Sequence, residues 1–341
     1  MFKVFNLLLF FKLPYYLNCG IVSPFIFLEK TKQKIVVSLE SLRFQGRSTR
    51  QSTLRVIKKS IFEEKMNRLF VVNKPIFRSS NGYMGYVKRK YGTKKVGFSG
   101  TLDPFATGCL IVATGQYTKL FQYLDKTPKS YKATLWLGAN SPSLDIEKID
   151  SIKEVKTFNE QTIKESLSSL QGELTYYPPK FCAKKINGMR AYELARAGEE
   201  VELKTITSTI YDIKLINYNH PFVHFEAKVS EGTYIRSLGA LVADILGVDG
   251  TLSSLHRIHE GQFYYEDEKA LDPFTHLALP SNIYTGEESF MELGKKLSIE
   301  YFEIQDEGVY LIETSSFFSI IEIIDGEVKY RFNRIPKFEE L

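Results

Sequence analysis

Cysteine is scarce in this chain of 341 residues, which holds only Cys19, Cys109 and Cys182. Their spacing fits no metal-ligand or disulfide motif, which argues against a zinc site or a disulfide framework and favours a reducing compartment. Histidine is also sparse, and none occurs in the first 219 residues. His256-x-x-His259 alone is a weak metal motif because catalytic metal sites need a third protein ligand and a second shell. We therefore expect no metal.

No apolar run in the sequence is long enough to cross a membrane. The run FNLLLFFKLPYYL, residues 5–17, is interrupted by Lys12 and Pro14, whereas a spanning helix needs about 20 apolar residues. Lys3 precedes this run as in a signal peptide, but no small-residue cleavage site follows. We predict that residues 1–65 are a disordered extension upstream of a natural start at Met66. A targeting or membrane-associating segment is the alternative.

The sequence also lacks the signatures of several large enzyme classes. It has no Walker or Rossmann glycine pattern and no Ser–His–Asp arrangement. No second carboxylate stands at a defined spacing from Asp103, which argues against an ordinary two-carboxylate glycosidase. Because histidine is absent from the first 219 residues, chemistry in that part of the chain must use aspartate, tyrosine and arginine.

Charge is distributed unevenly along the chain, whose formal net charge is +5. Residues 1–65 carry 12 basic and 4 acidic residues, residues 66–263 carry 26 and 19, and residues 264–341 carry 7 and 17. The basic central segment fits a polyanion such as RNA, although a solvated mixed surface gives the same numbers. Within it, YVKRKYGTKK at residues 86–95 interleaves cations with tyrosines, as in RNA-binding surfaces, with a solvated helix face as the alternative.

Hydrophobic periodicity predicts alternating strands and helices from residue 68 onward. The order of these elements has no regular βαβ period, which favours an α+β fold with a mixed, mainly antiparallel central sheet flanked by helices. Beyond residue 285 the sequence is acidic and rich in strand patterns, with a hairpin turn at Asp325-Gly326, so we expect a small C-terminal β module. Strands are expected at 68–72, 108–115, 129–138, 207–218 and 222–235, and helical segments at 79–92, 116–124, 159–172, 188–198 and 236–247.

A single aspartate, Asp103, lies inside GFSGTLDPFATG, residues 97–108, a run built mostly of small residues. One interpretation is an ordinary Asp-Pro turn. The other is a functional carboxylate, because small neighbours let a ligand approach the backbone closely and Pro104 restricts the backbone after the aspartate. Ser99, Thr101 and Thr107 add hydroxyl groups without charge. This fragment alone leaves both interpretations open.

The longer segment GFSGTLDPFATGCLIVATGQYTKLFQYL resembles the catalytic motif of the TruB-type pseudouridine synthases. The resemblance continues in the family's order through FVVNKP, KSYKATLWLG, YYPPKFCAKKINGMRAYELARAGEEVEL and VSEGTYIRSLGALVADIL, and it spans about residues 66–263. It implies the pseudouridine-synthase fold, with residues 66–272 as the catalytic domain and 285–341 as a reduced PUA-like module. It also implies an isomerase, without a cofactor, that converts uridine to pseudouridine at position 55 in the T-loop of tRNA.

The resemblance implies roles for individual residues. Asp103 matches the catalytic aspartate, which attacks the flipped uridine or promotes cleavage of its N-glycosidic bond. Tyr131 matches the tyrosine that stacks on the target base, and Tyr211 a tyrosine that lines the base pocket. Arg236 matches the arginine paired with the aspartate, and such a pair orients the carboxylate and lowers its pKa. Lys74 matches a motif lysine that either supports the active-site loop or is structural.

Two positions depart from the family pattern. Phe98 stands where many members carry a histidine that packs into the space vacated by everted bases; an aromatic ring still stacks, but the hydrogen bond of an imidazole is lost. Cys182 stands where serine is usual.

The resemblance further implies the T-arm of tRNA as partner, a monomer without an obligate protein partner, and a cytoplasmic location without membrane contact. An RNA-folding chaperone that acts without catalysis is the alternative function.

Overall fold

The structure of the chain is a computed structural model that describes residues 25–30, 33–38, 67–186, 188–199 and 203–338. The chain divides into two compact units, residues 1–61 and 62–341. In the first unit, strands β1 (Phe25–Lys30) and β2 (Gln33–Ser38) pair antiparallel. The rest of the predicted N-terminal extension, with its boundary at Met66, lies outside the described residues, so that prediction stays untested.

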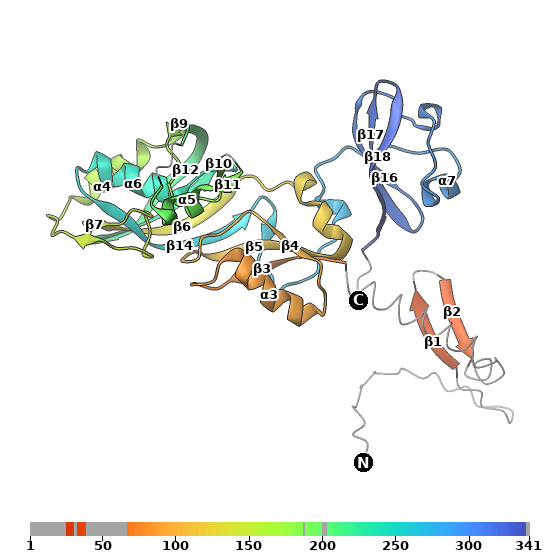
Figure 1. Cartoon of the computed structure of the whole chain (residues 1–341), viewed down its shortest axis with the longest axis horizontal. Coiled ribbons are helices and arrows are strands. Elements are labelled where there is room, and N and C mark those ends of the chain that lie inside the picture. Colours follow the sequence, from red (N-terminus) through yellow and green to blue (C-terminus); the bar gives the residue numbers. More distant parts are fainter. Residues whose placement is uncertain (1–24, 31–32, 39–66, 187, 200–202, 339–341) are drawn as a thin grey trace, which may run out of the picture. The chain divides into compact units, whose positions relative to one another are not determined.

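A nine-stranded sheet forms the centre of the second unit (Figure 1). Its main path runs β3-β5-β14-β6-β13-β12-β9, while β4 pairs with β5 and β15 pairs with β14. Among the described strands of this sheet, the β14–β5 pairing alone is parallel, so the predicted mixed, mainly antiparallel sheet is confirmed. The strands are β3 (Arg68–Lys74), β4 (Val96–Ser99), β5 (Thr107–Thr114), β6 (Lys129–Leu137), β9 (Gly172–Tyr176), β12 (Ile206–Asn219), β13 (Phe222–Val229), β14 (Gly250–Glu260) and β15 (Phe263–Tyr264).

Helices form where the sequence combines an amphipathic pattern with end signals. Ser79 caps α3 by accepting a hydrogen bond from the Gly82 N–H, and Gly92 ends that helix in the left-handed conformation with φ 63°. The predicted helical segments are confirmed, with boundaries shifted by a few residues. They are α3 (Ser80–Tyr91), η1 (Gly115–Lys119), η2 (Phe121–Tyr123), α4 (Glu160–Ser168), α5 (Ala191–Ala197) and α6 (Ile235–Ile245). Two small hairpins pair β7 (Ala139–Asn140) with β8 (Ser151–Ile152), and β10 (Lys185–Ile186) with β11 (Met189–Arg190).

Strands β3 and β5 contribute side chains to two hydrophobic cores, because successive side chains of a strand point to opposite faces. Phe70 and Leu110 belong to the core that includes residues of α3, α4 and α6. Their neighbours Leu69 and Ile111 belong to a second core, which includes Phe318 from the C-terminal sheet. Burial on both faces explains why each strand has a continuous apolar run, residues 69–72 in β3 and 109–113 in β5, rather than an alternating pattern.

The acidic C-terminal segment forms a separate three-stranded antiparallel sheet. Asp325 and Gly326, with φ 52° and 71°, make the predicted tight turn between its second and third strands. One face of this sheet contributes to the second core, and the other packs with Met291 in a third core. The predicted C-terminal β module is confirmed as part of the fold, while the exact domain boundaries stay predictions. Its elements are β16 (Gly308–Glu313), β17 (Phe317–Ile324), β18 (Glu327–Pro336), α7 (Glu288–Glu292), η3 (Phe274–His276) and η4 (Ile299–Tyr301).

Gly108 allows β5 to lie against β14 directly after the loop of Asp103. Its φ is +103°, and a Cβ at this position would overlap the carbonyl oxygen of Arg257. Gly172, the first residue of β9, has a similar φ of +108°, but a Cβ added there would meet nothing within 4 Å. These two glycines therefore separate the cost of the backbone conformation from the cost of close packing.

We expect Gly172→Ala to lower the free energy of unfolding by about 1–3 kcal/mol, through backbone strain alone. Gly108→Ala should lower it by a similar amount and by about 1–3 kcal/mol more, because the β5–β14 contact must open to admit the methyl group. Urea unfolding followed by circular dichroism measures both losses. Equal losses in the two variants would contradict the close-packing argument.

Candidate active site

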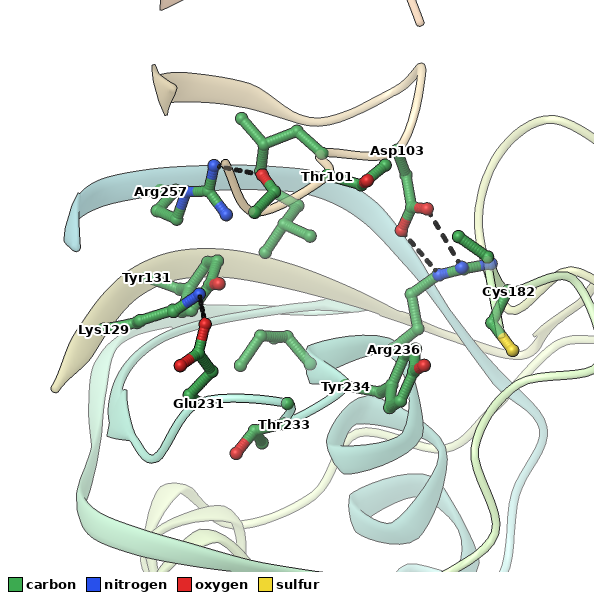
Figure 2. Close-up of a pocket in the computed structure, with 16 residues that line it drawn as sticks. Thr101, Asp103, Lys129, Tyr131, Cys182, Glu231, Thr233, Tyr234, Arg236 and Arg257 are labelled. Carbon is green, nitrogen blue, oxygen red and sulfur yellow. Dashed lines mark hydrogen bonds and ion pairs between the residues drawn. The ribbon is translucent and has the colours of Figure 1, made fainter. Parts of the chain in front are cut away.

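The loop that carries Asp103 joins β4 to β5 and is fixed by hydrogen bonds. The Ser80 hydroxyl, in the first turn of α3, accepts from the N–H of Leu102 and donates to its carbonyl, each at 2.9 Å. The N–H of Ala106 donates to the Asp103 carbonyl at 3.0 Å and closes a turn around Pro104. The Asp-Pro turn is therefore present, and its carboxylate also faces a pocket, so the two interpretations of Asp103 are compatible (Figure 2).

The pocket has a volume of about 270 Å³, just below the range of about 300–1,000 Å³ that is typical of sites for drug-sized ligands. This size suits one small ring. Its lining comes from the Asp103 loop, β6, the segment before β10, the turn into α6, and β14. The polar residues that line it are Thr101, Asp103, Lys129, Tyr131, Cys182, Glu231, Thr233, Tyr234, Arg236 and Arg257 (Figure 2).

Arg236, in the first turn of α6, uses all of its N–H donors. Nε and Nη2 bind the two carboxylate oxygens of Asp103 at 2.9 and 3.1 Å. Nη1 donates to the carbonyl of Ser143 at 2.7 Å and to the carboxylate of Asp145 at 3.1 Å, and Nη2 also donates to the carbonyl of Phe181 at 2.8 Å. Because a guanidinium is a rigid planar fork, this arrangement fixes the orientation of the Asp103 carboxylate.

Two carboxylates share the single guanidinium of Arg236. Burial raises the pKa of the Asp103 carboxyl, Arg236 and Lys74 oppose the rise, and the Asp145 carboxylate adds to it. The lowering expected from the arginine pair is thus outweighed, and the net direction is upward. The side chain of Asp103 is 32% exposed, whereas those of Arg236 and Asp145 are 4% and 3% exposed. The Asp103 carboxylate is therefore open to the pocket, while the side chains of Arg236 and Asp145 are buried.

Lys74, the last residue of β3, supports the same loop from outside the pocket. Its side chain is fully buried, and its ammonium donates to the carbonyl oxygens of Arg78 at 2.7 Å, Pro75 at 2.8 Å and Pro104 at 3.4 Å. Burial lowers the pKa of Lys74 to about 8. Of the two roles that the sequence left open for Lys74, this geometry fits the support of the active-site loop.

Arg257 fixes the other end of that loop. Its Nε donates to the carbonyl of Cys109 at 2.8 Å, and its Nη2 donates to the carbonyl of Gly100 at 2.7 Å. Its charge is balanced by Glu260 at 2.6 Å, a fully buried carboxylate that also pairs with Lys129 at 3.3 Å. These contacts bind β14 to β5 and to the residues that precede Asp103.

The predicted aromatic residues do not all reach the pocket. Tyr131, in β6, is 7% exposed and lines it. Phe98, in β4, is half-buried and packs against the main core, outside the lining. Tyr211 is 47% exposed on β12, where a β-bulge between Ile210 and Asp212 interrupts the pairing with β13. The structure therefore does not bring Tyr211 to the pocket that the sequence assigned to it.

The structure places two residues at this site that the sequence reasoning missed: Tyr234 in the pocket lining, and Asp145 bound to Arg236. Tyr234 lines the pocket immediately before α6, its N–H donates to the hydroxyl of Tyr176 at 3.0 Å, and burial raises the pKa of its phenol. Its place beside Arg236 in the motif GTYIR was a usable signal. Asp145 binds Arg236 from 91 positions away in the sequence, and no local pattern marks it.

The histidines have ordinary contacts in the structure. His256 lies 2.9 Å from the hydroxyl of Thr107, and the Nδ1 of His259 lies 2.9 Å from the carbonyl oxygen of Gly261. Within the described ranges, no three His, Cys, Asp or Glu side chains gather as metal ligands would. The helices in that part of the chain are too short or too polar to span a bilayer.

Comparison with known proteins shows the family to which this chain belongs. The family model described as "TruB family pseudouridylate synthase (N terminal domain)" matches residues 88–235, which contain Asp103 and Tyr131. A protein of Sulfurovum sp. named tRNA pseudouridine synthase B is 81% identical over 275 residues, which cover 81% of this chain and 99% of the relative. The chain belongs to the TruB family of pseudouridylate synthases.

Further TruB relatives agree with this result. Proteins named tRNA pseudouridine synthase B from Nitratiruptor sp. and Campylobacter concisus are 51% and 50% identical over 272 residues. Each match covers 80% of this chain, and 99% and 100% of the respective relative. The family and the enzyme class predicted from the sequence, an isomerase of the tRNA pseudouridine synthase type, are confirmed.

Solved structures support the fold of a TruB-type enzyme. The crystal structure of a Cbf5-Nop10-Gar1 complex matches with a TM-score of 0.55 and 19% identity over 82% of this chain and 87% of that chain. The archaeal box H/ACA sRNP Nop10-Cbf5 complex matches with a TM-score of 0.55 and 18% identity over 82% and 91%. At this identity the likeness concerns the fold alone, and it confirms the expected pseudouridine-synthase fold.

The ion pair at the TruB motif predicts a shift in pH dependence. Arg236→Gln should raise the pKa of Asp103 further, because it removes the main cation that opposes burial. On the expectation from the sequence that Asp103 acts as an ionised carboxylate, the acid limb of kcat/KM against pH should move to higher pH. Activity near neutral pH should fall by about 100-fold or more, because the carboxylate also loses its orientation. Release of tritium from [5-³H]uridine-labelled RNA measures the rate.

Arg236→Lys is the matched control for charge. A lysine keeps the cation but not the planar fork, so kcat/KM should fall while the acid limb stays close to its wild-type position. An acid limb that does not move in Arg236→Gln would contradict the electrostatic role of this ion pair.

Proposed function

We propose that this enzyme converts uridine to pseudouridine at position 55 in the T-loop of tRNA. The observation that carries the proposal is the Asp103 carboxylate, held on both oxygens by Arg236 and open to a pocket that it shares with Tyr131. A nucleotide in a folded loop reaches such a pocket only when it is flipped out of the stack. The names of the relatives support tRNA as the substrate.

The base leaves the sugar and returns through a different atom. The Asp103 carboxylate attacks C1′ of the flipped uridine, or stabilises the charge that develops there, as the bond between N1 and C1′ breaks. The electron pair of the broken bond stays on the uracil, which rotates within the pocket. A new bond then forms between C5 and C1′, and a carboxylate that had bonded to C1′ leaves with its own electron pair as this bond forms. The proton on C5 leaves and N1 takes up a proton, so the product is an isomer of the substrate. The atoms and electrons balance without a cofactor.

Several side chains in and beside the pocket have a part in this proposal. Arg236 orients the carboxylate, and Lys74 holds the loop that carries it. Tyr131 stacks on the uracil and takes part in removing the C5 proton, and Tyr234 supplies a second phenol to the pocket. Phe98 lies outside the pocket, which leaves base eversion as its predicted role. A monomer that acts in the cytoplasm without a protein partner stays a prediction.

Asp103→Asn tests the proposed chemistry, because it keeps the size of the side chain and removes its charge. Pseudouridine formation should fall by about 10⁴-fold or more, as expected when a reacting group is lost. Binding of tRNA, measured by filter retention, should change little. Isomerisation that persists in this variant would refute the site assignment. RNA refolding by the wild-type protein and the variant, with no pseudouridine from either, would favour the chaperone alternative.

A group of cations on α3 and the turn after it offers contacts to the RNA backbone. Lys88, Arg89 and Lys94 are exposed and form no ion pair within the described part of the chain, whereas Lys90 pairs with Glu268 at 2.7 Å. These cations border a shallow hollow that also includes Gly92 and Thr93 at the end of the helix. Free cations on a helix surface are suited to phosphates and carry no base specificity.

The double substitution Lys88→Ala and Arg89→Ala should weaken tRNA binding. It should also reduce the slope of log K against log salt by about two, since each lost phosphate contact removes about one released counterion. Lys296→Ala is the control, because Lys296 lies in the acidic C-terminal segment and pairs with Glu327 at 3.0 Å. A slope that falls equally in the control would show that general charge, not this surface, governs binding.

A further inference from the structure

Phe77 combines an unfavourable backbone conformation with an exposed aromatic ring. Its φ is +58°, in the left-handed region that residues with a bulky side chain rarely adopt. Its side chain is 68% exposed, and that of the preceding Ile76 is 44% exposed. Neither the strain nor the exposed ring helps to bury apolar surface. Such an outlier on the surface points to a function outside the fold.

The turn that carries Phe77 is fixed beside the catalytic loop. The Lys74 ammonium binds the carbonyl oxygens of Pro75 and Arg78, which lie on either side of Phe77 in the sequence. The same ammonium binds the carbonyl of Pro104, the residue after the catalytic aspartate. One buried cation therefore joins the two loops, and the phenyl ring is presented from a rigid turn next to the site.

We propose that Phe77 is a stacking platform for an unpaired base of the RNA, next to the nucleotide that enters the pocket. This inference rests on the proposed function. A pocket of about 270 Å³ takes one base, and flipping that base removes a stacking partner from its neighbours. An exposed phenyl ring replaces such a partner for any base, because every base has a π-face.

The charge around Phe77 favours RNA over a protein partner. Arg78 is exposed and forms no ion pair within the described part of the chain, so it is available for a phosphate next to the stacked base. Ile76 and Phe77 are the exposed large apolar side chains of this turn. Two such side chains fall short of the apolar patch of several hundred Å² that marks a protein interface.

Phe77→Gly separates the strain from the stacking, because glycine adopts a positive φ freely but has no ring. The melting temperature should rise by about 2–4 °C as the strain is removed. The KM for a T-arm RNA should rise by about 5- to 150-fold, the range that corresponds to loss of one base–aromatic stack, while kcat changes little. Phe77→Asn also tolerates this φ and lacks a ring without the added flexibility of glycine, so its KM should rise equally.

Phe77→Trp keeps an aromatic ring and should keep a KM close to that of the wild type. Bound RNA should quench its fluorescence, measured against the constant signal of Trp136, the single native tryptophan. Leu293→Ala removes a side chain that is 69% exposed elsewhere on the chain and should leave KM unchanged.

The outcomes separate this inference from the function on which it rests. A rise in melting temperature with unchanged KM and unchanged RNA binding would refute the stacking platform and leave the isomerase proposal intact. Absence of pseudouridine formation by the wild-type protein would refute the proposed function. In that case, filter retention of T-arm RNA by the wild type and by Phe77→Gly still tests the stacking role of Phe77. Equal binding by the two proteins would refute that role.

Discussion

The pairing of Arg236 with Asp103 is the contact on which the site depends. The guanidinium joins the loop after β4, the segment between β7 and β8, and the segment before β10 to the first turn of α6. Every N–H of the fork has an acceptor, so a shift of any one segment leaves a buried donor unpaired, at a cost of about 1–3 kcal/mol. The position of the carboxylate is therefore set by the packing of the whole domain.

The electrostatics of the site follow from the same arrangement. Burial and Asp145 raise the pKa of Asp103, while Arg236 and Lys74 oppose that rise. A carboxylate in such surroundings is more basic than one in water, yet it is held in one direction by its partner. Both properties suit the role proposed for Asp103, in which the carboxylate approaches a sugar carbon as positive charge develops there. The apolar and small residues around it keep that charge interaction strong.

The sequence predicted the parts of the structure that have local signals. Helix α3 has its cap at Ser79, and the C-terminal hairpin has its turn at Asp325-Gly326, so both were readable from short patterns. Asp103 was recognised through a long motif resemblance. Asp145 was not predictable, because it reaches the site only through tertiary packing. Tyr211, expected at the pocket, lies exposed on β12 at a β-bulge that no local pattern announced.

Successive side chains of β3 and β5 pack into two different cores, and one of these cores joins the C-terminal sheet to the synthase domain. Leu69, Val71 and Ile111 are covered by a core that includes residues of that sheet. Without the C-terminal sheet, these side chains would form an exposed apolar patch that favours aggregation. Loss of the C-terminal segment would therefore be tolerated only if polar residues replaced these side chains on both strands at the same time. We expect evolution to retain the C-terminal segment together with the synthase domain.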